Sequence, residues 1–152
     1  MALAWVLHLV GDIHQPPHCS ARVTSREPRG DRGGNDFDLD SKSLHTRWDG
    51  AINKGVVRTG NEATSAYLTR VTGVGMKAHP QASLAGELNP AAFADWCQES
   101  FDITKEEIYP HSLRRGQTPP PAYPKTTIAI AKERAALGGY RLGALLEELL
   151  GR

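Results

Sequence analysis

Apolar residues recur with a helical period at the start of the chain. They stand at Leu3, Val6, Leu7, Val10 and Ile13. Positions spaced by three or four residues share one face of a helix with 3.6 residues per turn. The pair Pro16-Pro17 cannot continue such a helix. The pattern therefore predicts a helix over residues 2–15.

Four further stretches of the sequence have helical patterns. A second helix is expected from about Ser43, with its end among the glycines at 50, 55 and 60. A third is expected from Asn61-Glu62 to about Thr72 or Val74. Asn89-Pro90 combines a capping residue with proline at the first helical position and predicts a fourth helix, which runs to about Tyr109. The longest pattern covers residues 125–150, with Gly138-Gly139 as a candidate bend.

The segments between these helices are long and polar. Residues 19–40 contain the pair Gly33-Gly34 and indicate a loop or a short hairpin, whereas "GQTPPPAYP" is typical of an extended linker. No period-two alternation of apolar and polar residues is found, so no strand is predicted. The expected fold class is all-α with long loops.

Composition narrows the class of protein without identifying it. The chain has 152 residues and a net charge of +1, which suits one domain over residues 1–152 and excludes a basic nucleic-acid coat or an acidic tail. No stretch approaches the roughly 20 apolar residues of a membrane span. "MALAWVLHLV" lacks a basic start and contains His8, so we interpret it as part of the domain and not as a signal peptide. Cys19 and Cys97 fit no zinc pattern, and the sequence leaves their pairing open.

Two histidine–aspartate pairs carry the candidate chemistry. His8 and Asp12 are four residues apart in the first predicted helix, and His45 and Asp49 are four apart in the second. Residues at i and i+4 share a helix face, so each helix offers one imidazole and one carboxylate. His18 follows the first pair just after the prolines. One such pair is usually a surface ion pair, but two pairs and a third histidine favour a zinc site.

The other histidines and the tryptophans have less specific interpretations. His14 lies on a different helix face from Asp12, and we expect it to bond to the backbone or to another side chain. His79 and His111 lie in loop-like contexts and receive no role. Trp5 and Trp48 are adjacent to the candidate ligands, and we expect both to pack in the core.

The loop between the two pairs is rich in arginine. Arg22, Arg26, Arg29 and Arg32 lie in it, and a solvated loop is the usual reason for such charges. Phosphate contacts become plausible if a metal site lies beside the loop. Asn35 follows two glycines, which allow close approach of the backbone to a ligand or simply form a turn.

These motifs resemble a known family. "HLVGDIHQPPH", then "GGND", then "LHTRWD" are similar to sequences of the zinc-dependent single-strand nucleases of fungi, plants and bacteria, the family that includes mung bean nuclease. "WCQESFDITKEEIYP" and "AALGGYRLGALLEELL" resemble that family's last two helices. The resemblance covers nearly the whole chain, and it matches the later part of the family's domain.

The resemblance implies a fold, an activity and a set of metal ligands. Family members are all-α, share their fold with zinc-dependent phospholipase C, and hold three zinc ions in a cleft. His8 and Asp12 match ligands of a close pair of ions, with Asp12 as the bridging carboxylate. His18, His45 and Asp49 match the complete protein ligand set of the third ion. The implied reaction is hydrolysis of single-stranded DNA and RNA, in which a metal-bound hydroxide attacks phosphorus and the products carry 5′-phosphates.

The substrate contacts that we assign with the resemblance are Asn35 and Arg32. Secretion or a periplasmic location is expected from the family, and a monomer is the expected state. The family's remaining ligands and its base-stacking aromatic residue come from an earlier region that has no counterpart here. We therefore expect a C-terminal portion of the domain, N-terminally truncated, that is weak or inactive alone and leaves Trp5, Leu9 and Ile13 uncovered.

Two other functions remain open from the sequence. One is a zinc-dependent phospholipase C, although "GGND" followed closely by "LHTRWD" favours the nuclease. The other is a non-catalytic, zinc-stabilised helical remnant, which the missing ligands keep open. Should the chain alone be active, His14, His79 and His111 are the first candidates to complete its site.

Overall fold

The computed structural model describes residues 2–89 and 92–151, and its regular elements are helical. In chain order they are α1 Ala2–Ile13, η1 Pro16–Cys19, α2 Leu44–Asp49, α3 Ala51–Gly55, α4 Thr64–Ala78, η2 Gln81–Glu87, α5 Phe93–Ile103, η3 Thr104–Ile108 and α6 Tyr123–Leu150. Within these described ranges no strand forms, although one isolated β-bridge joins Asp38 to Ser43. The all-α prediction is confirmed.

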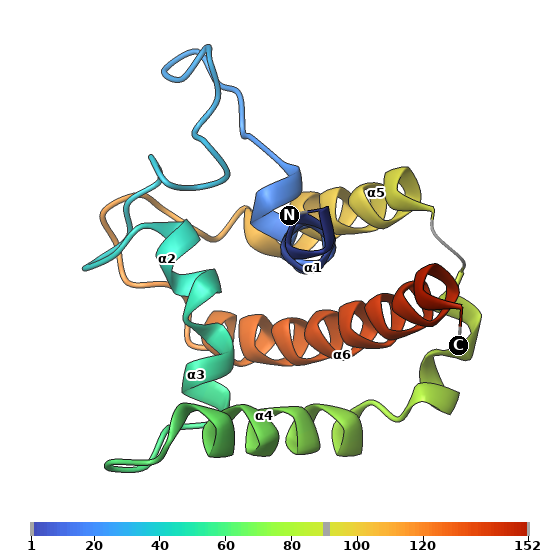
Figure 1. Cartoon of the computed structure of the whole chain (residues 1–152). Helices are drawn as coiled ribbons and strands as arrows, with labels where there is room; N and C mark the ends of the chain where they lie inside the picture. Colours follow the sequence, from blue (N-terminus) through green and yellow to red (C-terminus); the bar gives the residue numbers. More distant parts are fainter. Residues whose placement is uncertain (1, 90–91, 152) are drawn as a thin grey trace.

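The long helix α6 is the centre of the molecule (Figure 1). Helices α1 and α5 pack on one side of it, α4 packs on the opposite side, and α3 contacts α6 near its start. Residues 20–43 leave this helical body after η1 and form a projecting segment, which we call the loop arm (Figure 1). The arm returns to the body at α2, so it connects the two elements that carry the candidate ligands.

The larger of two apolar clusters anchors the loop arm and α2 to the rest of the fold. Its buried members are Phe37, Leu39, Leu44, Trp48, Ile108, Leu113 and Tyr123. Trp48 is 1% exposed, as expected from the sequence, and its indole Nε1 donates to the Tyr123 hydroxyl at 2.9 Å. That hydroxyl donates in turn to the Ile108 carbonyl at 2.9 Å. The buried polar atoms of this cluster therefore satisfy one another.

The second cluster joins α1, α5 and α6 through Val10, Trp96 and Leu145. Beside it, His14 is buried, and burial, aided by the charges of two arginines, lowers the pKa of His14 to about 4. The imidazole is therefore neutral at pH 7. Its Nδ1 lies 2.7 Å from the Val10 carbonyl and its Nε2 lies 2.9 Å from the Arg141 guanidinium. The prediction that His14 bonds to the backbone or to another side chain is confirmed, since it contacts both.

Several helix boundaries differ from those expected. Helix α1 ends at Ile13 and not at residue 15, because η1 begins at the prolines. The second helix is divided into α2 and α3 at Gly50, and the third begins at Thr64 and continues to Ala78. The expected start of the fourth helix at Asn89-Pro90 includes residues outside the described ranges, and α5 as described begins at Phe93.

Helix α6 runs without interruption from Tyr123 to Leu150 through the candidate bend at Gly138-Gly139. A Cβ atom at Gly138 would lie 2.9 Å from Cγ of His14. The glycine at this position therefore serves the close packing of α6 against α1, which a sequence pattern does not distinguish from a bend.

The core position expected for Trp5 is wrong. Trp5 is 60% exposed, and its ring meets His8 edge-on with centroids 6.1 Å apart. In the described part of the chain, α1 packs on α5 and α6 along the face of Val10, which leaves Trp5 and Leu9 uncovered. The uncovered surface expected at Trp5 and Leu9 is thus confirmed, whereas Ile13 is half-buried against the Val10 cluster.

Candidate metal centre

Three candidate ligands converge from η1 and α2. Nε2 of His18 lies 3.6 Å from one carboxylate oxygen of Asp49, and Nε2 of His45 lies 3.5 Å from the other. One ligand atom from each of the three residues falls within 4.8 Å of the others. In residues 2–89 and 92–151, this is the one group of three histidine, cysteine or acidic side chains close enough to share an ion. We call His18, His45 and Asp49 the triad.

Local sequence explains why these side chains meet. The prolines at 16 and 17 end α1 and form the 3₁₀ turn η1, which redirects the chain and presents His18. Ser43 caps α2 by accepting a hydrogen bond from the Thr46 amide at 3.2 Å. His45 and Asp49 then fall one turn apart on the same face of α2, as their spacing predicted.

The second nitrogen of each histidine is held by the protein. Nδ1 of His45 donates to the Gly33 carbonyl at 2.9 Å, and Nδ1 of His18 faces an oxygen of Asp12 at 3.2 Å. The two imidazole rings stack with centroids 4.9 Å apart and an angle of 8° between planes. Ligating histidines generally use such partners, which fix the ring and leave the other nitrogen free for the metal.

Gly33 joins the two histidine-bearing elements. Its φ is 63°, and a Cβ atom there would lie 2.4 Å from the Pro17 carbonyl oxygen of η1. Gly34 has a φ of 84° and packs against Leu44 of α2. A Cβ atom at Gly34 would lie only 3.0–3.2 Å from carbon atoms of the Leu44 side chain. Both glycines of "GGND" are therefore required by backbone conformation and by close approach.

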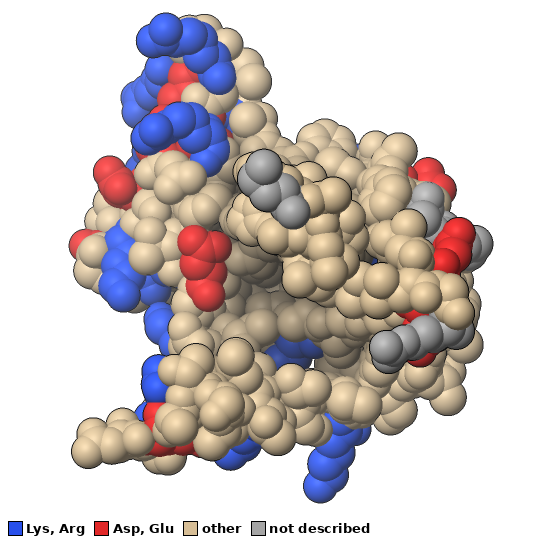
Figure 2. All heavy atoms as spheres, in the orientation of Figure 1, with Lys and Arg blue, Asp and Glu red and all other residues tan. Residues whose placement is uncertain are grey.

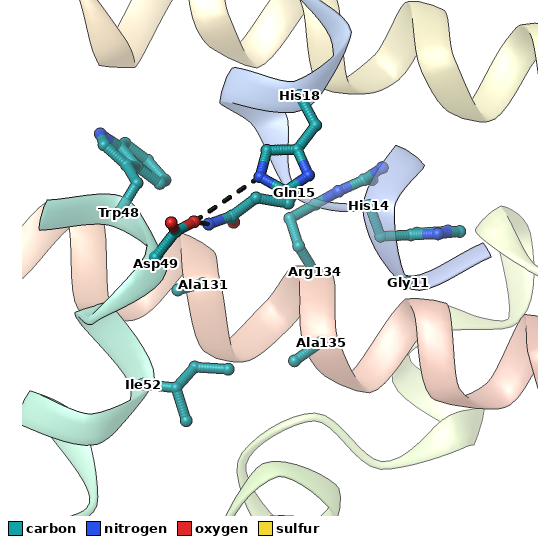
Figure 3. A pocket seen from close by; sticks show the side chains of 10 residues that line it. All are labelled: Gly11, His14, Gln15, His18, Trp48, Asp49, Ile52, Ala131, Arg134 and Ala135. Carbon is teal, nitrogen blue, oxygen red and sulfur yellow. Dashed lines mark hydrogen bonds and ion pairs between the residues drawn. The ribbon is translucent and has the colours of Figure 1, made fainter. Parts of the chain in front are cut away.

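Gln15 is a contact of the triad that the sequence analysis missed. Its side-chain amide donates to Asp49 at 3.1 Å. Both residues line a pocket of ≈ 290 Å³ between α1, α2, α3 and α6, together with Gly11, His14, His18, Trp48, Ile52, Ala131, Arg134 and Ala135 (Figure 3). Two members of the triad, His18 and Asp49, thus border a pocket that is open to solvent on one side and is lined along α6 by Ala131, Arg134 and Ala135.

His8 and Asp12 lie beside the triad without completing a second group. Nε2 of His8 is 3.4 Å from one oxygen of Asp12, while the other oxygen of Asp12 faces His18. Asp12 therefore stands between His8 and the triad. In the described ranges no third histidine, cysteine or acidic side chain joins His8 and Asp12 closely enough to share an ion.

The two residues assigned to substrate contacts are engaged within the loop arm. Arg32 forms a bidentate pair with Asp36, at 2.9 and 2.6 Å. The Asn35 amide donates to the Arg32 carbonyl at 2.8 Å. The role of Asn35 and Arg32 in substrate binding stays a prediction.

Asp31 organises the loop arm behind the triad and carried no recognisable signal in the sequence. It is 0% exposed, and one of its oxygens accepts from the Arg22 amide at 2.9 Å and from the Gly34 amide at 3.1 Å. Its other oxygen accepts from the Tyr109 hydroxyl at 2.7 Å. Burial, and then this bond, raise the pKa of Tyr109. Asp31 therefore fixes the chain next to Gly33, whose carbonyl orients His45.

The donor set suits a catalytic type of zinc site. Two imidazole nitrogens and one carboxylate are the ligands of many zinc enzymes, which keep a fourth position for water or substrate. The Asp49 side chain is 50% exposed and those of His18 and His45 are 27% and 19% exposed, so the fourth position would face solvent. A structural zinc site normally has four protein ligands, which this cluster does not offer.

Comparison with known proteins agrees with the geometry. A family model described as S1/P1 Nuclease matches residues 1–151, which is essentially the whole chain. Neither the curated proteins nor the solved structures that were compared gave a match.

Proposed function

The chain belongs to the S1/P1 nuclease family, and from this premise we propose that it is a zinc-dependent endonuclease. Its proposed substrates are single-stranded DNA and RNA, and its products carry 5′-phosphates. The family supports nuclease chemistry and metal dependence; the identity of the ion, the strand preference and the products belong to the proposal.

The observation that carries the proposal is the triad with its supporting contacts. His18, His45 and Asp49 would hold one zinc ion, while Asp12 and the Gly33 carbonyl orient the two imidazoles. Zinc at such a site would supply a Lewis acid that stabilises developing charge on a phosphodiester oxygen. His8 and Asp12 would contribute to a neighbouring ion site, with Asp12 as the shared carboxylate. Asn35 and Arg32 would contact the substrate.

The proposal includes a location and an assembly state. We expect secretion or a periplasmic location, as is typical of the family, and a monomer. The helices of the described residues do not include one with the length and apolar character needed to cross a membrane.

The test is an assay of purified protein with added zinc against three substrates. A labelled single strand should be cut faster than its duplex, phosphatidylcholine should remain intact, and a ligase should accept the products because they carry 5′-phosphates. Turnover is expected below the about 1 per second that is typical of enzymes, because His8 and Asp12 supply only two ligands to their ion. Hydrolysis of phosphatidylcholine without DNA cleavage would instead favour a phospholipase, and bound zinc without any turnover would favour a non-catalytic domain.

A further inference from the structure

A second pocket, of ≈ 520 Å³, lies between the loop arm and the segment before α6, and no residue of the triad lines it. Four arginines line it: Arg22 and Arg26 from the arm, and Arg114 and Arg115 from the segment before α6. We call it the basic pocket. Lysine and arginine atoms gather visibly on the projecting arm, apart from the helical body (Figure 2).

The basic pocket carries an excess of positive charge. Glu27 is the one acidic residue in its lining, against four arginines, which leaves a balance of +3. Glu27 pairs with Arg115, whose guanidinium also donates to the Asp36 carbonyl. Among the residues that the structure describes, no carboxylate forms an ion pair with Arg22 or Arg26. Their charges are therefore available to an anion.

Aromatic rings hold two of the four arginines in place. The Arg22 guanidinium lies over Phe37 at 5.5 Å and over Tyr109 at 5.7 Å, and that of Arg115 lies over Phe37 at 4.5 Å. Stacking of this kind orders a guanidinium while leaving its N–H edge free to donate. Burial lowers the pKa of Arg115, and the nearby charges of Arg22 and Arg26 lower it further. The cations thus lie close enough to repel one another and favour a bound anion.

The basic pocket is connected to the triad by a few bonds. The Arg22 amide and the Gly34 amide share one oxygen of Asp31, and the Gly33 carbonyl holds His45. Arg22 is four residues beyond His18, so their Cα atoms are at most about 14 Å apart even if the chain is fully extended. A strand of a few nucleotides can span that distance.

We propose that the basic pocket binds phosphate groups of a nucleic-acid strand, several nucleotides away from the phosphodiester that lies at the triad. Guanidinium groups donate to phosphate oxygens in pairs and form strong, charge-assisted hydrogen bonds. The inference rests on the proposed function for the choice of ligand. It extends the binding site to Arg114 and Arg115, which lie about 90 residues beyond Arg22 and Arg26 in the sequence. It leaves out Arg29, which does not line the pocket.

The test measures binding independently of cleavage. A fluorescent phosphorothioate oligothymidylate keeps one negative charge per linkage and resists hydrolysis, so its anisotropy reports the Kd of the zinc-loaded protein. The double variant Arg22→Gln/Arg26→Gln should raise Kd about tenfold at low salt and reduce the slope of log K against log salt by about 1.4, the loss of two phosphate contacts on a single strand. The charge-matched control Arg29→Gln/Lys42→Gln removes two cations from the same loop arm outside the pocket and should change both quantities much less.

The outcomes separate this inference from the proposed function. Equal weakening by the double variant and its control would overturn the inference, since a diffuse field and not a pocket would then attract the strand. Arg26→Gln alone, which leaves the stacked Arg22 in place, should raise Kd by an intermediate amount, and an unchanged Kd would also contradict the pocket. Weakening that is specific to the pocket variants, in a protein that cuts no DNA, would support the binding site and refute the nuclease.

Discussion

Each histidine of the triad has one nitrogen directed toward Asp49 and the other held by a group outside the triad. The groups that hold them, the Asp12 carboxylate and the Gly33 carbonyl, are not ligands of the proposed triad ion. Partners of this kind commonly change metal affinity or activity 10- to 100-fold when they are removed. Two predictions at the scale of single residues therefore concern substitutions outside the triad.

Gly33→Ala should weaken zinc binding at least about tenfold. The new Cβ would meet the Pro17 carbonyl oxygen at 2.4 Å in a left-handed backbone conformation, so the chain must shift and the His45 contact is lost. Gly60→Ala is the matched control, because Gly60 also has a positive φ, 45°, but a Cβ there meets nothing within 4 Å. Competition with a chromophoric chelator measures both affinities. Equal affinities for the two variants would show that the Gly33 contact does not orient His45.

Asp12→Asn should abolish nuclease activity and lower the zinc affinity of the triad. An amide cannot supply a negative charge to two cations, and it binds the His18 ring less strongly than a carboxylate does. Cleavage of a single-stranded oligonucleotide and zinc content, measured on the same preparation, check both effects. Near-normal turnover by Asp12→Asn would rule out the bridging role.

The sequence predicted which candidate ligands would lie together better than it predicted their surroundings. Spacing of four residues placed His45 and Asp49 on one face of α2, and that relation is local. The Gln15 contact with Asp49 joins residues 34 positions apart, and the Tyr109 bond to Asp31 joins residues 78 apart. The periodicity of the sequence cannot predict such contacts, because they depend on how η1, the loop arm and η3 pack in space.

At the scale of elements, the existence of the longer helices followed from local pattern, whereas the ends of the helices did not, and the short helix η2 was not predicted. The end expected at about Thr72 or Val74 was too early, because α4 continues through Gly73 and Gly75 to Ala78, where its packing against α6 outweighs the weak helix propensity of glycine. Conversely, Gly50 divides the second predicted helix into α2 and α3. The expected core packing of Trp5 was wrong for a related reason, since periodicity alone does not show which apolar face finds a partner.

The start of α4 is held by an ion pair that should make stability depend on pH. The Glu62 carboxylate accepts two hydrogen bonds from Arg70, at 2.7 and 3.1 Å, and this pairing lowers the pKa of Glu62 to about 2. An unfolded chain has the ordinary value of 4.5. The stabilisation is therefore complete above pH 4.5 and is lost as the pH falls through about 2.

Glu62→Gln should lower the melting temperature at pH 7, and the difference from the original protein should shrink between pH 4.5 and 2. Thermal unfolding followed by circular dichroism at a series of pH values measures it. Glu106→Gln, which removes an exposed carboxylate from η3, serves as the control. A melting-temperature difference that is constant with pH would show that the Glu62–Arg70 pair is not responsible.

At the scale of the whole molecule, α1 presents an apolar surface to solvent. Trp5 and Leu9, four residues apart and therefore on one face of the helix, are 60% and 51% exposed, and a contiguous apolar surface is uncommon on a stable monomer. The face lies on the same helix as His8 and Asp12. The apolar surface is therefore next to the candidate site.

The exposed face should bind the dye anilinonaphthalene sulfonate and increase its fluorescence. The variant Trp5→Gln/Leu9→Gln should reduce that fluorescence clearly, because it removes two large apolar side chains without disturbing the packing of Val10. Val57→Gln/Met76→Gln is the control, since these exposed apolar residues lie outside α1. Dye binding that falls equally in both variants would mean that the α1 face is not the principal apolar surface.

The central claim is that His18, His45 and Asp49 hold a zinc ion, and zinc content measured by emission spectroscopy after dialysis tests it most directly. The protein should retain zinc, His45→Ala should lose most of the zinc bound by the triad, and His79→Ala should retain as much as the original because His79 lies outside the triad. Circular dichroism of each variant confirms that the helices persist. Unchanged zinc content in a folded His45→Ala protein would contradict the assignment of the metal centre.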